Sequence, residues 1–189
     1  MPNLPRIVRS RLAYDGYAQV HVLTLVDDGG EHSREVVSRG NAACVLPYDP
    51  ERKLALLVRL PRAPLLMAGL PEPLLEAPAG IVDPGETAET TARREAMEEV
   101  GVALGPLEPA GVCWPSPGLF DEQVHLFLAP YRAADRTGPG GGLAEEHEGI
   151  SVVEMPLTEL ERMADSGELT DLKTLTLALL LRLRHMELF

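Results

Sequence analysis

Alternating apolar and polar positions begin near residue 18. Ala18, Val20 and Val22 alternate with Gln19 and His21, a spacing typical of a half-buried β-strand. The sequence Asp-Asp-Gly-Gly at 27–30 predicts a hairpin turn, and residues 31–38 predict the returning strand. An isolated hairpin is marginally stable in water. We therefore expect residues 1–40 to form a β-rich arm that packs on the rest of the chain or on a second copy of it.

The pattern changes at residue 41, where strands and helices begin to interleave. Apolar runs predict strands at 42–46, 54–60, 112–114, 124–129 and 150–153. Residues 87–100 predict a helix ended by Gly101, residues 158–165 a helix begun by a capping box of Thr158 and Glu161, and residues 172–186 a Leu-rich helix. The Pro- and Leu-rich residues 61–74 are expected to be an irregular loop. This order predicts an α/β sandwich over residues 41–189.

Composition and charge narrow the class of protein. The 189 residues are 45% hydrophobic with a net charge of −12, which predicts a folded domain that does not bind nucleic acid or an anionic membrane through its overall charge. No apolar stretch is long enough for a membrane span, and the first residues do not resemble a signal peptide. Cys44 and Cys113 form no CxxC pair, so we expect free thiols and a cytoplasmic location.

Acidic residues concentrate in the helix predicted at 87–100 and in the loop before it. At about 100° per residue, Glu95 and Glu99 point within about 40° of each other and Glu98 lies about 60° to the other side of Glu95. Two interpretations remain open at this point. The acids form a solvated helix face, or they bind a hard divalent cation such as Mg²⁺ or Mn²⁺.

The spacing of these residues resembles a known motif. Gly80 is followed by five residues and Glu86, then by seven residues and the run Arg-Glu-Ala-Met-Glu-Glu-Val-Gly-Val at 94–102. This pattern resembles the Nudix box, Gx5Ex7REUxEExGU, in which U is a bulky aliphatic residue. Ala96 departs from the pattern because a larger aliphatic residue is usual there, and we interpret this as a change in packing alone.

Other segments resemble the Nudix branch that hydrolyses nucleoside diphosphate sugars, namely the ADP-ribose pyrophosphatases and GDP-mannose hydrolases. These segments are Glu76 with Pro-Ala-Gly at 78–80, Pro117, Glu122, the acidic loop at 146–150 and Arg-Gly-Asn at 39–41. The resemblance implies an α/β/α sandwich with a mixed β-sheet and a small N-terminal β arm. It also implies Mg²⁺-dependent cleavage of a pyrophosphate bond, which yields a nucleoside monophosphate and a sugar phosphate.

The resemblance also implies roles for individual residues. The implied metal ligands are Glu95, Glu99, Glu98, Glu148 and the Ala79 carbonyl. The implied catalytic residues are Glu146, Glu148, Glu98, Arg94 and Glu86, with Glu86 and Arg94 paired to brace the loop on the helix. Which of Glu145, Glu146 and Glu148 is the general base stays open. The candidate substrate-binding residues are Arg39, Arg59, Arg62, Ser116 and Glu122, although each arginine is equally consistent with a surface position.

Several alternatives remain. One alternative is a Nudix enzyme that acts on (d)NTPs or dinucleoside polyphosphates. Another is a non-catalytic domain that senses a nucleotide. The glycine-rich residues 138–142 are either a free linker or a hinge that carries Glu146 and Glu148. Related enzymes are homodimers, so the resemblance implies a homodimer that uses the N-terminal arm.

Overall fold

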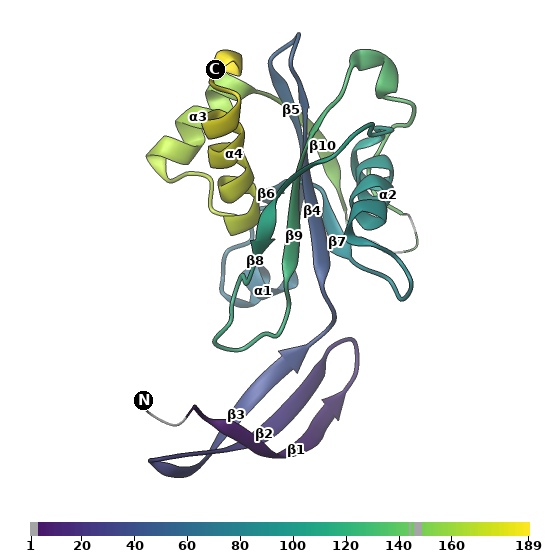
Figure 1. Ribbon diagram of the computed structural model, residues 1–189. Helices are drawn as coiled ribbons and strands as arrows, with labels where there is room; N and C mark the ends of the chain where they lie inside the picture. The colour runs from purple at the N-terminus through teal and green to yellow at the C-terminus, as the bar shows by residue number, and fades with distance from the viewer. Residues whose placement is uncertain (1–3, 144, 146–148) are drawn as a thin grey trace. The chain divides into compact units, whose positions relative to one another are not determined.

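The chain folds into two compact units. The computed structural model describes residues 4–143, 145 and 149–189. One unit, the arm unit, combines the residues up to Asn41 with Trp114–Gln123, and the other, the main unit, contains Ala42–Cys113 and Val124–Phe189 (Figure 1). The sequence predicted an arm of residues 1–40 but did not indicate that the distant segment 114–123 belongs with it.

The arm unit contains one more strand than the sequence predicted. β1 (Arg6–Asp15), β2 (Gln19–Asp27) and β3 (Gly30–Ser38) form an antiparallel sheet in that order. The pairing of β1 with β2 shifts register between Ile7 and Arg9 and again between Leu12 and Tyr14. These irregularities break the two-residue period, which explains why the alternation of apolar and polar positions did not reveal β1.

The strands of the main unit form one mixed sheet. Its strands are β4 (Ala42–Asp49), β5 (Leu54–Leu60), β6 (Leu74–Glu76), β7 (Ala79–Ile81), β8 (Glu108–Cys113), β9 (Val124–Pro130) and β10 (Ser151–Pro156). The main order is β10-β5-β4-β9-β8, in which β4 and β9 run parallel and the other neighbours run antiparallel. Every residue of β4 is buried, as expected for a central strand covered on both faces.

Helices cover both faces of this sheet. The α-helices are α1 (Ala63–Met67), α2 (Ala88–Val100), α3 (Leu157–Ser166) and α4 (Leu172–Arg184), with short 3₁₀ turns at Ala133–Asp135 and Met186–Leu188. Figure 1 shows α2 on one side of the sheet and α3 with α4 on the other. Separate apolar clusters fill the two interfaces, so the predicted α/β/α sandwich is confirmed. In the described part of the chain, no helix has the length and apolar character needed to cross a membrane.

Two local predictions were wrong. Residues 61–74 contain the short helix α1, which begins just after Arg62 with proline near its start, rather than being irregular throughout. The expected capping box of Thr158 and Glu161 is also absent, because α3 begins at Leu157 and Pro156 is its N-cap. The Leu157 N–H instead donates to the Lys53 carbonyl at 2.9 Å, which ties the start of α3 to the β4–β5 turn.

A fork in the sheet positions the candidate site. β4 and β5 pair with each other only at Tyr48–Ala55 and Asp49–Leu54, next to the turn that joins them. Farther along, β6 pairs with β5 and β7 pairs with β4. Residues 74–81, here called the fork segment, thus cross from one strand to the other. This crossing places Ala79 and Gly80 directly before the loop that leads into α2.

Candidate active site

Helix α2 buries two of its acidic residues, Glu95 and Glu99. The Thr87 side chain caps the helix by accepting a hydrogen bond from the Thr90 N–H at 3.1 Å, and Gly101 ends it with φ of 71°. Ala92 and Ala96 are fully buried in the apolar cluster between α2 and the sheet. The small side chain of Ala96 therefore faces the core, consistent with its interpretation as a packing feature. Glu95 and Glu99 are only 9% and 3% exposed, so their carboxylates need polar partners.

Arg94 is one such partner, and it connects three acids of the motif. Its guanidinium group donates to Glu86 at 3.2 and 3.3 Å, to Glu95 at 2.7 Å and to Glu98 at 3.0 Å. Burial alone would lower the pKa of Arg94, but these carboxylates outweigh it and the pKa is raised. The pair of Glu86 and Arg94 implied by the resemblance is therefore present, and Arg94 also holds Glu95 and Glu98.

The same pair fastens the loop before α2. Hydrogen bonds from Arg94 and from the Thr91 hydroxyl, the latter at 2.8 Å, lower the pKa of Glu86. Arg94 also donates to the Ile81 carbonyl at 3.2 Å. These contacts join β7, the loop and the helix, so the acids of α2 keep a fixed position relative to the fork segment.

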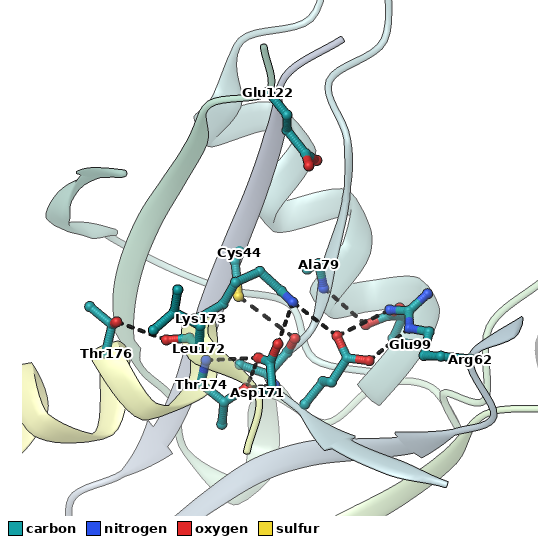
Figure 2. Close-up of polar contacts among 12 residues, drawn as sticks. Cys44, Arg62, Ala79, Glu99, Glu122, Asp171, Leu172, Lys173, Thr174 and Thr176 are labelled. Atoms are coloured by element: carbon teal, nitrogen blue, oxygen red, sulfur yellow. Dashed lines mark hydrogen bonds and ion pairs between the residues drawn. The ribbon is translucent and has the colours of Figure 1, made fainter. Parts of the chain in front are cut away.

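The fork segment lies directly against the acids of α2. The Ala79 N–H donates to Glu99 Oε2 at 3.2 Å (Figure 2). A Cβ atom built on Gly80 would overlap the Glu95 carboxylate, so a larger residue at this position would displace that side chain. Two consecutive backbone residues therefore contact the two most buried carboxylates of the helix.

The donors gathered here suit a hard divalent cation. Carboxylates of Glu95, Glu98 and Glu99 and a backbone carbonyl are the oxygen ligands that Mg²⁺ and Mn²⁺ favour. Among residues 4–143, 145 and 149–189, however, no three acidic, histidine or cysteine side chains are already grouped as ligands around one point. Glu95 and Glu98 instead turn toward Arg94. The donor chemistry of these residues therefore fits a hard divalent cation.

Comparison with known proteins identifies the family. Residues 38–176 match the NUDIX domain. The chain belongs to the NUDIX family. A GDP-mannose pyrophosphatase of Cronobacter sakazakii is 37% identical over 96% of this chain and 94% of its own length. A GDP-mannose pyrophosphatase of Escherichia coli is 34% identical over 95% of this chain and 96% of its own length. The crystal structure of an ADP compounds hydrolase has a TM-score of 0.75 at 20% identity, covering 95% of this chain and 93% of that one, and supports the fold.

The glycine-rich residues 138–142 cap the C-terminal end of the Nudix-box helix. The N–H groups of Gly141 and Gly142 donate to the carbonyls of Glu99 and Glu98 at 2.8 and 2.9 Å. Gly140 has φ of 68°, and a Cβ atom there would crowd the Glu99 carbonyl. The interpretation as a free linker is therefore wrong, because the segment satisfies helix carbonyls that would otherwise lack donors. A role as a hinge stays a prediction.

The acidic loop that follows is described only in part. Glu145 is exposed, and Glu146 and Glu148 lie outside the described residues. Their implied roles as general base or metal ligand therefore remain predictions. The Nudix box itself supplies every other acid to which a catalytic or metal-binding role was assigned.

The candidate substrate-binding residues divide between the two units. In the arm unit, Arg39 pairs with Glu122 at 3.1 Å, and the Ser116 carbonyl accepts hydrogen bonds from the N–H groups of Leu119 and Phe120. In the main unit, Arg59 is an exposed residue of β5, whereas Arg62 donates to both carboxylate oxygens of Glu76 at 2.7 and 3.2 Å. Arg62 is thus held in place by a carboxylate that is 2% exposed.

A polar cluster beneath the fork segment was not predicted from the sequence. Lys173 lies between Asp171 at 2.6 Å and Glu76 at 3.1 Å. Figure 2 shows Lys173 beside Asp171. Burial alone would lower the pKa of Lys173, but the two carboxylates outweigh it and the pKa is raised. The local signal in the sequence was Asp171 directly before a Leu-rich run, which is typical of a helix N-cap. The contact of Lys173 with Glu76 joins residues 97 positions apart, so the pattern along the chain did not indicate this cluster.

Proposed function

We propose that this Nudix hydrolase cleaves the pyrophosphate bond of a nucleoside diphosphate sugar, with GDP-mannose as the first substrate to test. The observation that carries the proposal is the similarity to GDP-mannose pyrophosphatases over almost the whole chain. The match to the Cronobacter sakazakii enzyme covers 96% of this chain. That similarity extends beyond the NUDIX domain match at 38–176 and includes the arm. The expected products are GMP and mannose 1-phosphate.

The proposal assigns the cation to the acids of α2. Glu95 and Glu99 would hold Mg²⁺, with Glu98 and the Ala79 carbonyl as further ligands. Mn²⁺ would bind to the same ligands as a substitute for Mg²⁺. When bound, the cation neutralises the diphosphate and activates the attacking water. This neutralisation is needed because a chain of charge −12 repels the anionic substrate.

The remaining residues act around that cation. Arg94 offsets the charge of Glu86, Glu95 and Glu98 and holds their carboxylates close to one another. Glu146 or Glu148 would accept the proton of the attacking water. Arg62, oriented by Glu76, is a candidate for binding a phosphate or sugar hydroxyl. Arg59 in the main unit, and Arg39, Ser116 and Glu122 in the arm unit, remain candidate substrate-binding residues.

A substrate panel with controlled metal content tests the function. We expect GDP-mannose or another sugar nucleotide to give a kcat/KM at least about tenfold above that of any dNTP or diadenosine polyphosphate. This ratio corresponds to about 1.4 kcal/mol of additional transition-state binding. Excess EDTA should abolish turnover, and added Mg²⁺ should restore it. Preference for a dNTP, turnover that persists in EDTA, or nucleotide binding without hydrolysis of any member would contradict the proposal.

The same proposal includes a homodimer formed through the arm. Every residue of β1 is exposed, including the apolar side chains of Ile7, Leu12 and Tyr14 at 61, 44 and 61%. A small sheet that exposes so much apolar surface is expected to be covered, and a second copy of the chain fits this requirement.

Light scattering tests the dimer. We expect a mass of twice 20.5 kDa for the protein and a shift toward 20.5 kDa for the double variant Ile7→Glu, Leu12→Glu. Arg9→Glu is the control, because it changes the charge of the same strand without removing an apolar side chain. A monomer for the unchanged protein would refute this part of the proposal. We also propose a cytoplasmic location for this protein, which is supported by the absence of a disulfide at its two cysteines, Cys44 and Cys113.

A further inference from the structure

The fork segment is held from both faces of the sheet. On the α2 side, the Ala79 N–H donates to Glu99 at 3.2 Å. On the α4 side, the Ala77 N–H donates to the Thr174 hydroxyl oxygen at 2.7 Å. Figure 2 shows the two anchoring residues, Glu99 on the α2 ribbon and Thr174 at the start of α4. Glu99 belongs to the Nudix box, whereas Thr174 has no role in the function proposed above.

The Ala77 N–H has few possible partners where the segment crosses from β5 to β4. Ala77 is 1% exposed and lies between β6 and β7, and the next residue, Pro78, has no N–H. Leaving a buried N–H without an acceptor destabilises the fold, because the hydrogen bond it makes to water in the unfolded chain is not replaced. The Thr174 hydroxyl therefore determines where the crossing is fixed against α4.

The hydroxyl hydrogen of Thr174 is used in a second hydrogen bond. The Thr174 hydroxyl donates its proton to Asp171 Oδ2 at 2.6 Å, which leaves its oxygen to accept from Ala77. Asp171 is the N-cap of α4 and also accepts the Thr174 N–H at 2.9 Å. Lys173 links Asp171 to Glu76, the residue directly before Ala77. The start of α4 and the start of the crossing are thus joined by two polar contacts, that of Thr174 with Ala77 and that of Lys173 with Glu76.

The chain between this anchor and the proposed metal ligand is short and stiff. Proline fixes one backbone dihedral of Pro78, and the Pro78 carbonyl accepts from the Val45 N–H at 2.9 Å. Ala79 follows immediately and pairs with Cys44 of β4. A displacement at Ala77 would therefore be transmitted to the Ala79 carbonyl and to the Glu99 carboxylate that Ala79 contacts.

We propose that Thr174 is a positioning residue for the cation site, acting through the Ala77 N–H to hold the Ala79 carbonyl and the Glu99 carboxylate in place. The inference rests on the proposed function in one respect, that Ala79 and Glu99 bind the divalent cation. It predicts that the hydroxyl of Thr174 affects cation affinity although it does not touch the cation.

The test compares Thr174→Val, which keeps the shape and removes the hydroxyl, with Thr174→Ser, which keeps the hydroxyl. Mn²⁺ binding is measured by isothermal titration calorimetry without substrate, together with the Mg²⁺ dependence of kcat and KM. We expect Thr174→Val to weaken Mn²⁺ binding by about 10-fold or more, in the range typical of residues that orient metal ligands. Thr174→Ser should stay within about twofold of the unchanged protein.

The possible results distinguish failure of the positioning role of Thr174 from failure of the proposed function. Thermal melting establishes that the variants are folded, and Thr174→Ala replaces Thr174→Val if the valine variant does not fold. A folded variant without the hydroxyl that binds Mn²⁺ as tightly as the unchanged protein overturns the inference, even if it melts at a lower temperature. Absence of Mn²⁺ binding in the unchanged protein also overturns it. Normal Mn²⁺ binding without hydrolysis of any sugar nucleotide would instead refute the proposed function and leave the positioning role standing.

Discussion

Glu99→Gln is expected to lower kcat/KM by about 100-fold at saturating Mg²⁺ while the protein stays folded. Glutamine keeps the size of the side chain and an oxygen that accepts the Ala79 N–H, so the contact at 3.2 Å survives. It removes the negative charge, which strengthens the binding of a divalent cation to its ligand. Loss of one electrostatic group that stabilises a transition state typically costs about 10²- to 10³-fold in rate. Initial rates measured over a range of GDP-mannose and Mg²⁺ concentrations check this expectation.

Glu89→Gln is the matched control for that variant. Glu89 lies on the same helix and undergoes the same chemical change, but its side chain is exposed in the first turn. It should retain kcat/KM within about twofold, since surface substitutions rarely alter stability by more than about 0.5 kcal/mol. A Glu99→Gln variant with the activity of the control would remove Glu99 from the cation site.

The parts of the site that the sequence predicted are those set by local geometry. Glu95 and Glu99 lie four residues apart on one helix, so their common face followed from the helical repeat. The start of α2 at Thr87 and its end at Gly101 were also predictable, because capping depends on neighbouring residues. The family motif then added the contact of Glu86 with Arg94.

The parts that the sequence did not predict depend on contacts between distant segments. The crossing of residues 74–81 between β5 and β4 arises because those two strands diverge, which is a property of the assembled sheet. Thr174 reaches Ala77 across 97 positions of sequence. The glycines at 138–142 resembled a linker because the carbonyls that they cap, those of Glu98 and Glu99, lie about forty positions away along the chain.

Gly80→Ala is expected to lower kcat/KM by about 100-fold, because the single added methyl group occupies space that the Glu95 carboxylate fills. Glu95 is 9% exposed and is held by Arg94 at 2.7 Å, so it has little freedom to move aside. Misplacing a reacting group by about 1 Å costs about 10²-fold in rate. Overpacking a filled site also costs about 1–3 kcal/mol of folding stability. Steady-state kinetics and urea unfolding measure the two effects separately.

Gly105→Ala provides the matched control for this steric argument. Gly105 has no heavy atom within 4 Å of an added Cβ, and its φ lies outside the range that L-residues avoid. Its alanine variant should therefore keep kcat/KM and unfold at the same urea concentration or slightly higher, since replacing glycine at a compatible position restricts the unfolded chain by about 0.4–1 kcal/mol. Loss of activity in Gly80→Ala alone would show that the space beside Glu95 matters. Equal activity in the two variants would mean that Glu95 does not need its present position for catalysis.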